Sequence, residues 1–104
     1  MFNQEAAAVR AYQRVAQLID SYDETLRLIR VRINQEIARA VSLDAARLDE
    51  LNTDLDLTDR LREQLREHGR GGNAGVASQR LLALYAKVDT LAAQWPVQII
   101  RERP

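Results

Sequence analysis

Residues able to make or break bonds are few in this chain, and their spacing does not gather them into a site. The sequence has no cysteine and a single histidine, His68. Thiolate chemistry and a zinc site built from several histidines of one chain are therefore excluded. His68 precedes Gly69, and a histidine there suits the negative end of a helix better than it suits catalysis. We expect no enzymatic activity, no metal and no cofactor.

A glycine-rich segment, GRGGNAG at residues 69–75, is the one place where backbone amides could approach a phosphate. A phosphate-binding loop needs a preceding strand and a lysine followed by serine or threonine, and neither is present. We interpret the segment as a flexible linker between two helices, with Gly69 in a left-handed conformation at the end of the first of them.

Charged residues gather at two places. The stretch DELNTDLDLTD at residues 49–59 is acidic, but a calcium loop counted from Asp54 has Leu65 where the bidentate glutamate is needed. We interpret it as a solvated helix face or a patch for a basic partner. Arg27 and Arg30 could hold a carboxylate or phosphate, although acidic residues one turn earlier, at positions 23 and 24, predict pairing within the helix.

The elements that carry these residues are predicted to be three helices. Residues 3–41 contain neither glycine nor proline, and their apolar residues recur at steps of three and four. This stripe, the predicted core face of a long first helix, consists of Val15, Leu18, Ile19, Tyr22, Leu26, Ile29, Ile33, Ile37 and Ala40. A second helix is predicted over 43–68, with Ser42 as N-cap and with a possible break near 52–59, where weak helix formers crowd together.

The third helix is predicted over residues 76–94, because Pro96 stops it and leaves an extended tail at 96–104. The predicted fold is a single all-α domain over residues 1–104, an antiparallel three-helix bundle. Leu28 and Val31 lie off the first helix's stripe and give it a second apolar side. A second copy of the chain could cover that second side and complete the bundle, so we expect a homo-oligomer.

The charge balance and hydropathy narrow the expected partners. Fifteen basic residues offset fifteen acidic ones, which disfavours nucleic-acid binding. No apolar run is long enough to span a bilayer, and the start, MFNQEAAAVR, does not resemble a secretory signal. We expect a cytoplasmic protein without membrane insertion.

Two family resemblances bear on function. Ile19, Asp20, Asp23 and Glu24 form a stretch similar to one in small all-helical chorismate mutases, an enzyme alternative. Alignment on that stretch, however, places Ile33 and Asp44 where that family has an arginine and a lysine.

The second resemblance lies in GVASQRLLALY at residues 75–85, which is similar to the G-x5-L-x2-L-Y element of flagellin export chaperones of the FliS type. Ala11-Tyr12-Gln13 is similar to the opening of that family, whereas Arg80 stands where the family has an asparagine. FlgN and FliT export chaperones resemble the chain in size and in their long, leucine-rich helices. The resemblance implies a bacterial chaperone that shields an apolar helical segment of a secreted or structural subunit.

The apolar pattern favours a binding protein independently, because its apolar surface exceeds what a minimal three-helix core needs. We expect a partner helix in a groove between the first and third helices. Its predicted contacts are Tyr22, Leu28, Val31, Leu81, Tyr85 and Val88. The alternatives are a structural helical protein that associates only with itself and the chorismate-mutase-like enzyme.

Overall fold

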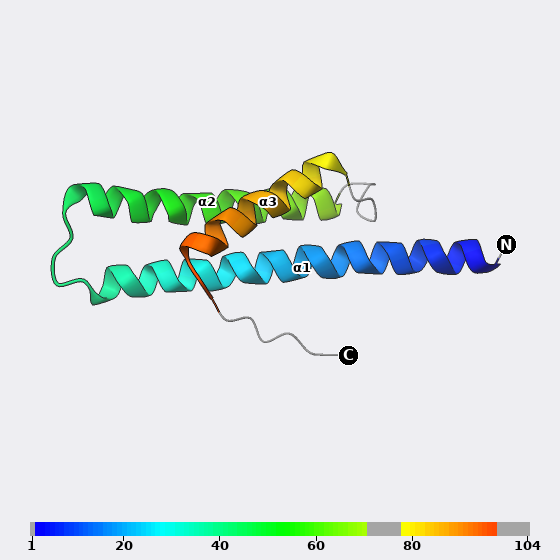
Figure 1. Ribbon diagram of the computed structural model, residues 1–104, viewed down its shortest axis with the longest axis horizontal. Helices are drawn as coiled ribbons and strands as arrows, with labels where there is room; N and C mark the ends of the chain where they lie inside the picture. Colours follow the sequence, from blue (N-terminus) through cyan, green and yellow to red (C-terminus); the bar gives the residue numbers. More distant parts are fainter. Residues whose placement is uncertain (1, 71–77, 98–104) are drawn as a thin grey trace.

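The computed structural model describes residues 2–70 and 78–97, with side-chain exposure from residue 5 onward. It contains three helices, α1 (Phe2–Arg39), α2 (Ala45–Arg70) and α3 (Gln79–Gln94). α2 returns antiparallel beside α1, and α3 crosses the pair at an angle (Figure 1). The described residues include no strand, so the predicted all-α three-helix bundle is confirmed.

The core lies between the three helices and is built from the apolar spacing of the sequence. α1 contributes residues at steps of three and four, among them Leu26, Ile29 and Ile33, each with no exposed surface. α2 and α3 close over this stripe with Leu51, Leu61, Leu65, Leu81, Leu84, Tyr85, Val88 and Leu91. The bundle therefore buries one face of each helix.

The α1–α2 turn corrects the predicted cap. Asp44, not Ser42, caps α2: its Oδ1 accepts a hydrogen bond from the backbone N–H of Arg47 at 2.7 Å. Asp44 also places a negative charge at the positive end of the helix. Ser42 lies two residues too early, in the exposed turn before the helix.

The predicted end of α2 also needs correction. α2 is continuous from Ala45 to Arg70, without a break near residues 52–59. Thr53 and Thr58 are accommodated within it and donate their hydroxyls to backbone carbonyls of the preceding turn. Gly69 lies inside α2 and has no left-handed conformation. The first two positions of the predicted linker are thus helical, and residues 71–75 lie outside the described part of the chain.

α3 begins and ends close to the predicted positions. Ser78 is its N-cap and accepts a hydrogen bond from the N–H of Leu81 at 3.1 Å. The predicted start at Val76 lies outside the described residues. Trp95 forms the C-cap and Pro96 follows, as the sequence predicts. Of the predicted tail, only Pro96 and Val97 are described.

The beginning of α1 extends beyond the bundle. α1 has 38 residues and α2 has 26, so α1 is longer by about 18 Å at 1.5 Å per residue. Figure 1 shows the excess at the N-terminal end, past the ends of α2 and α3. Every side chain from Glu5 to Arg14 is exposed. We call residues 5–14 the N-terminal arm.

Candidate functional site

The six residues predicted to contact a partner divide between the core and the surface. Leu81, Tyr85 and Val88 are buried in the protein's own core, and each residue is at most 8% exposed. Tyr22 and Leu28 are half-buried, and Val31 is exposed. An accessible surface for a partner must therefore be sought elsewhere than along the α3 side of the predicted groove.

The space between α1 and α3 is filled by two stacked aromatic rings. Tyr22 of α1 and Tyr85 of α3 lie with ring centroids 4.1 Å apart and planes 13° from parallel. The Tyr22 hydroxyl donates to Asp89 at 3.4 Å. The Tyr85 hydroxyl is buried and has no hydrogen-bond partner among the described residues. Burial, and to a lesser extent the neighbouring Tyr22, raises the pKa of Tyr85.

Replacement of Tyr85 by phenylalanine is expected to raise the free energy of unfolding by up to about 1 kcal/mol, because it removes a buried unsatisfied hydroxyl and keeps the ring. The raised pKa of Tyr85 also predicts how the stability of the protein changes with pH. The folded-state pKa is raised, so the unfolded chain loses this proton first and stability falls as pH rises past about 10. The phenylalanine variant lacks this alkaline loss.

Urea unfolding at pH 7 and at alkaline pH measures both effects. Tyr12→Phe is the control, because Tyr12 is exposed on the N-terminal arm. A loss of stability in Tyr85→Phe larger than that in the control would contradict the prediction and show that the hydroxyl is satisfied in the folded protein.

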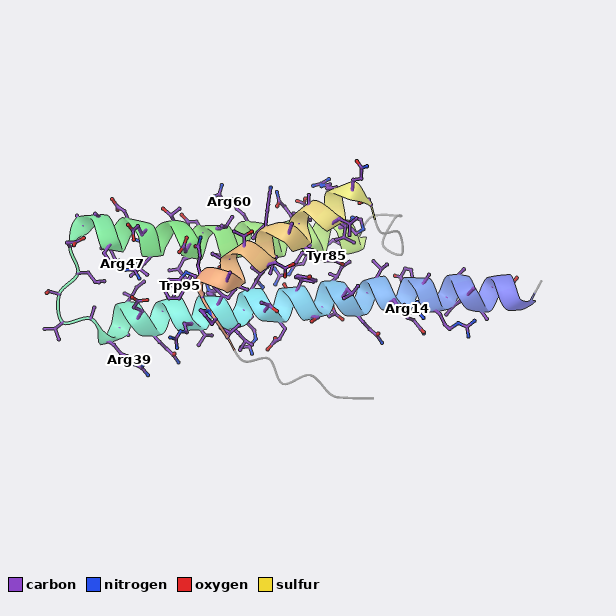
Figure 2. The ribbon with its side chains drawn as sticks, in the orientation of Figure 1. Arg14, Arg39, Arg47, Arg60, Tyr85 and Trp95 are labelled. Carbon is purple, nitrogen blue, oxygen red and sulfur yellow. The ribbon has the colours of Figure 1, made fainter. Side chains whose placement is uncertain are left out.

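Trp95 joins the end of α3 to the first half of α2. Its indole is buried, and Nε1 donates a hydrogen bond to Asp54 of α2 at 2.9 Å. The Arg47 guanidinium lies 5.9 Å from the ring centroid, within the range of a cation–π contact. Figure 2 shows Trp95 turned toward the space between α1 and α2, with Arg47 nearby on α2.

An open hollow of about 670 Å³ borders Trp95. Arg47 crosses it and pairs with Glu36 of α1 at 2.8 Å and with Glu50 at 3.0 Å. These hydrogen bonds, first to Glu36 and then to Glu50, raise the pKa of Arg47. Arg47 is thus already bound to two carboxylates of the chain, and its pair with Glu36 holds α2 to α1.

The stretch that resembles chorismate mutase is used in ion pairs. Arg62 of α2 donates from Nε to Oδ1 of Asp23 at 3.0 Å and from Nη2 to Oδ2 at 3.3 Å. Glu24 pairs with Arg27 at 2.6 Å, and this hydrogen bond lowers the pKa of Glu24. In the described residues, Asp23 and Glu24 therefore neutralise arginines of the bundle itself.

The other charged clusters also contribute to packing. The predicted pairing of Arg27 within α1 is confirmed, whereas Arg30 reaches across to Asp59 of α2. Asp54 accepts the hydrogen bond from Trp95, so two carboxylates of the acidic stretch contact neighbouring helices. Of its three aspartates at 54, 56 and 59, Asp56 and Asp59 are exposed and match the predicted solvated face, whereas Asp54 is half-buried. Within the described residues, no three His, Asp or Glu side chains group as metal ligands would.

The surface that sequence reasoning missed is the N-terminal arm. Counting back from Val15, the first buried residue of α1, the spacing of the core stripe continues through Ala11 and Ala8. Tyr12 lies beside them, 52% exposed, and lines a shallow hollow with Gly69 near the end of α2. The core stripe of α1 thus runs on without a covering helix among the described residues. The sequence does indicate this surface, because Ala8 and Ala11 continue the core spacing, but a search for large apolar residues overlooks alanines.

Comparison with known proteins gives no relative: the chain matches no family model, no curated protein and no solved structure. None of the helices in the described part of the chain has the length and hydropathy needed to cross a bilayer.

Proposed function

We propose that this protein is a non-enzymatic helical binding protein that shields an apolar helical segment of a partner. At the finer level we propose an export chaperone or adaptor for a secreted or flagellar subunit, acting in the bacterial cytoplasm. The resemblance at residues 75–85 supports this finer proposal. The observation that carries the general proposal is the N-terminal arm, on which the core stripe of α1 continues with no helix of the described residues covering it.

The arm suits a helix better than a small ligand. Its exposed apolar residues, Ala8, Ala11 and Tyr12, follow one another along a helix face and form a shallow strip. Small-molecule sites are concave and bury most of the ligand, which a single protruding helix does not do. A second helix laid on the strip would continue the packing that α2 provides farther along α1. Small alanine side chains allow two helix backbones to approach closely.

The test uses an 18-residue synthetic helix with leucines on one face and glutamines on the other, labelled for fluorescence anisotropy. We expect it to bind the protein, and we expect Ala8→Gln/Tyr12→Gln to weaken binding about tenfold or more, since burial of one large apolar side chain contributes about 1.5–3 kcal/mol. Ala6→Gln is the matched control, because Ala6 is exposed on the opposite side of the same arm.

Light scattering on the same variants measures the oligomeric state and so distinguishes binding of a partner helix from self-association. A dimer of the natural protein that becomes monomeric in Ala8→Gln/Tyr12→Gln would show that the arm binds a second copy, and the structural alternative would replace the chaperone proposal. If the leucine peptide binds neither the natural protein nor the control, the proposed function is wrong.

A further inference from the structure

The groove between α2 and α3 contains an open hollow that lies apart from the contacts described above. Its volume is about 300 Å³, and it is lined by Leu57, Lys87, Thr90, Leu91 and Gln94. Leu91 is buried and Leu57 is half-buried against the core, so the floor of the hollow is apolar. A concave site of this size with an apolar floor suits a small molecule. We call it the α2–α3 hollow.

Lys87 gives the α2–α3 hollow a positive charge that the described residues do not neutralise. It is the only lysine of the chain, and it forms no ion pair with a described residue. The positions three and four residues away on α3, which share its face of the helix, hold Ala83, Leu84, Thr90 and Leu91. The ammonium group therefore has no carboxylate of the described chain to pair with.

Four other hollows of the described residues differ from this one in having acidic linings. Glu36 lines the hollow beside Trp95 and a second one at the α1–α2 turn. Asp20 lines the two hollows beside the end of α2. The lining of the α2–α3 hollow contains no acidic residue. Of these hollows in the described part of the chain, it is thus the one whose charge favours an anion.

The length of the lining indicates the length of the ligand. Lys87 and Gln94 are seven residues apart, which is about 10 Å along α3 at 1.5 Å per residue. An unbranched chain of about eight carbons covers this distance, at roughly 1.2 Å per bond in an extended chain. We propose that the α2–α3 hollow binds a straight-chain fatty acid of medium length, with its carboxylate on Lys87 and its hydrocarbon chain on Leu57 and Leu91. The inference goes beyond the proposed function, since the hollow contains no residue of the N-terminal arm.

Two other kinds of occupant fit the α2–α3 hollow less well. A phosphate ester carries nearly two negative charges, of which one ammonium group neutralises only part beside apolar side chains. The lining also contains no arginine, whose planar set of donors favours phosphate. A partner helix needs an apolar strip over several turns, whereas the apolar lining consists of Leu57 and Leu91. A carboxylate with a short chain matches both the single charge and the small apolar floor.

The experiment titrates the protein with octanoate, 1-octanol, octylamine and acetate, and follows the backbone amides by NMR. We expect octanoate to shift the amide signals around Leu57 and Leu91. It should bind about two- to fivefold more tightly than 1-octanol, which is the range for an exposed ion pair. Acetate lacks the chain and octylamine has the opposite charge, so both should bind more weakly than 1-octanol.

Three variants separate the charge of the site from its apolar floor. Lys87→Met should lower the affinity for octanoate to that for 1-octanol and leave 1-octanol binding unchanged. Arg14→Met is the matched control, because Arg14 is exposed and forms no ion pair with a described residue. Thr90→Trp should weaken both ligands by filling the hollow. Its fold should persist, since the Thr90 hydroxyl donates to Ala86 within α3.

The outcomes separate this inference from the proposed function. Binding of octylamine as tight as that of octanoate overturns the α2–α3 hollow as a fatty-acid site, and so does an equal loss of octanoate affinity in Lys87→Met and Arg14→Met. The arm variant Ala8→Gln/Tyr12→Gln should bind octanoate as the natural protein does. Loss of octanoate binding in that variant would place the ligand on the N-terminal arm and would also overturn the inference. The leucine peptide tests the arm separately, so either proposal can fail without the other.

Discussion

Replacement of Trp95 by alanine is expected to lower the free energy of unfolding by about 3–5 kcal/mol, as measured by urea denaturation. The substitution empties the space that the buried indole fills at the end of α3. It also leaves Asp54 without the Nε1 donor that lies 2.9 Å away, and it removes the ring beneath Arg47. Since small domains are stable by only about 5–15 kcal/mol, the loss should be evident as a lower thermal midpoint.

Two further variants divide this effect into its parts. Trp95→Phe keeps most of the apolar volume and loses the donor, so its cost should be the smaller of the two and should reflect mainly the hydrogen bond. Leu82→Ala is the control, because Leu82 is 57% exposed on the same helix and its removal should cost little. A loss for Trp95→Ala no larger than that for Leu82→Ala would contradict the role of Trp95 in holding α3 to the hairpin.

The helices themselves are well predicted from the sequence, because their signals are local. A run of 38 residues without proline or glycine forms α1, and Pro96 ends α3 as expected. The predicted N-cap of α2, Ser42, was wrong, since Asp44 is an equally good cap residue and only the path of the turn decides between them. Gly69 is helical because a glycine near a helix end permits termination there without requiring it.

Contacts between helices are where sequence reasoning fails. Nothing local to the acidic stretch indicates that Asp54 accepts a hydrogen bond from a residue 41 positions away. Thr58 looked like a weak helix former, yet it is fully buried, with its hydroxyl bonded to the carbonyl of Leu55 at 2.7 Å. Such partners depend on the crossing of α3 over the hairpin, which apolar spacing does not determine.

The candidate binding surface shows the same limit. The periodicity of α3 correctly places Leu81 and Val88 on one face, but periodicity does not tell whether a face meets the protein's own core or a partner. The length difference between α1 and α2 does contain that information, since a longer helix must leave part of its stripe uncovered. The N-terminal arm could therefore have been predicted from the expected bounds of the two helices.

Replacement of Ile33 by alanine is expected to cost about 2–5 kcal/mol, because Ile33 has no exposed surface and a cavity would remain in the tightly packed face of α1. Ile33→Val, which removes one methylene group, should cost only about 0.5–1.5 kcal/mol. Urea denaturation with a constant m-value in all variants would show that the difference lies in stability and not in the denatured state.

Val31→Ala gives the matched comparison two residues away on α1. Val31 is 41% exposed, and alanine has the higher helix propensity, so the variant should change stability by no more than about 0.5 kcal/mol in either direction. A cost near that of Ile33→Ala would mean that Val31 is covered in solution by a second copy of the chain, since no described residue of the same chain buries it. The pair of variants thus measures packing within the bundle at one position and reports hidden self-association at the other.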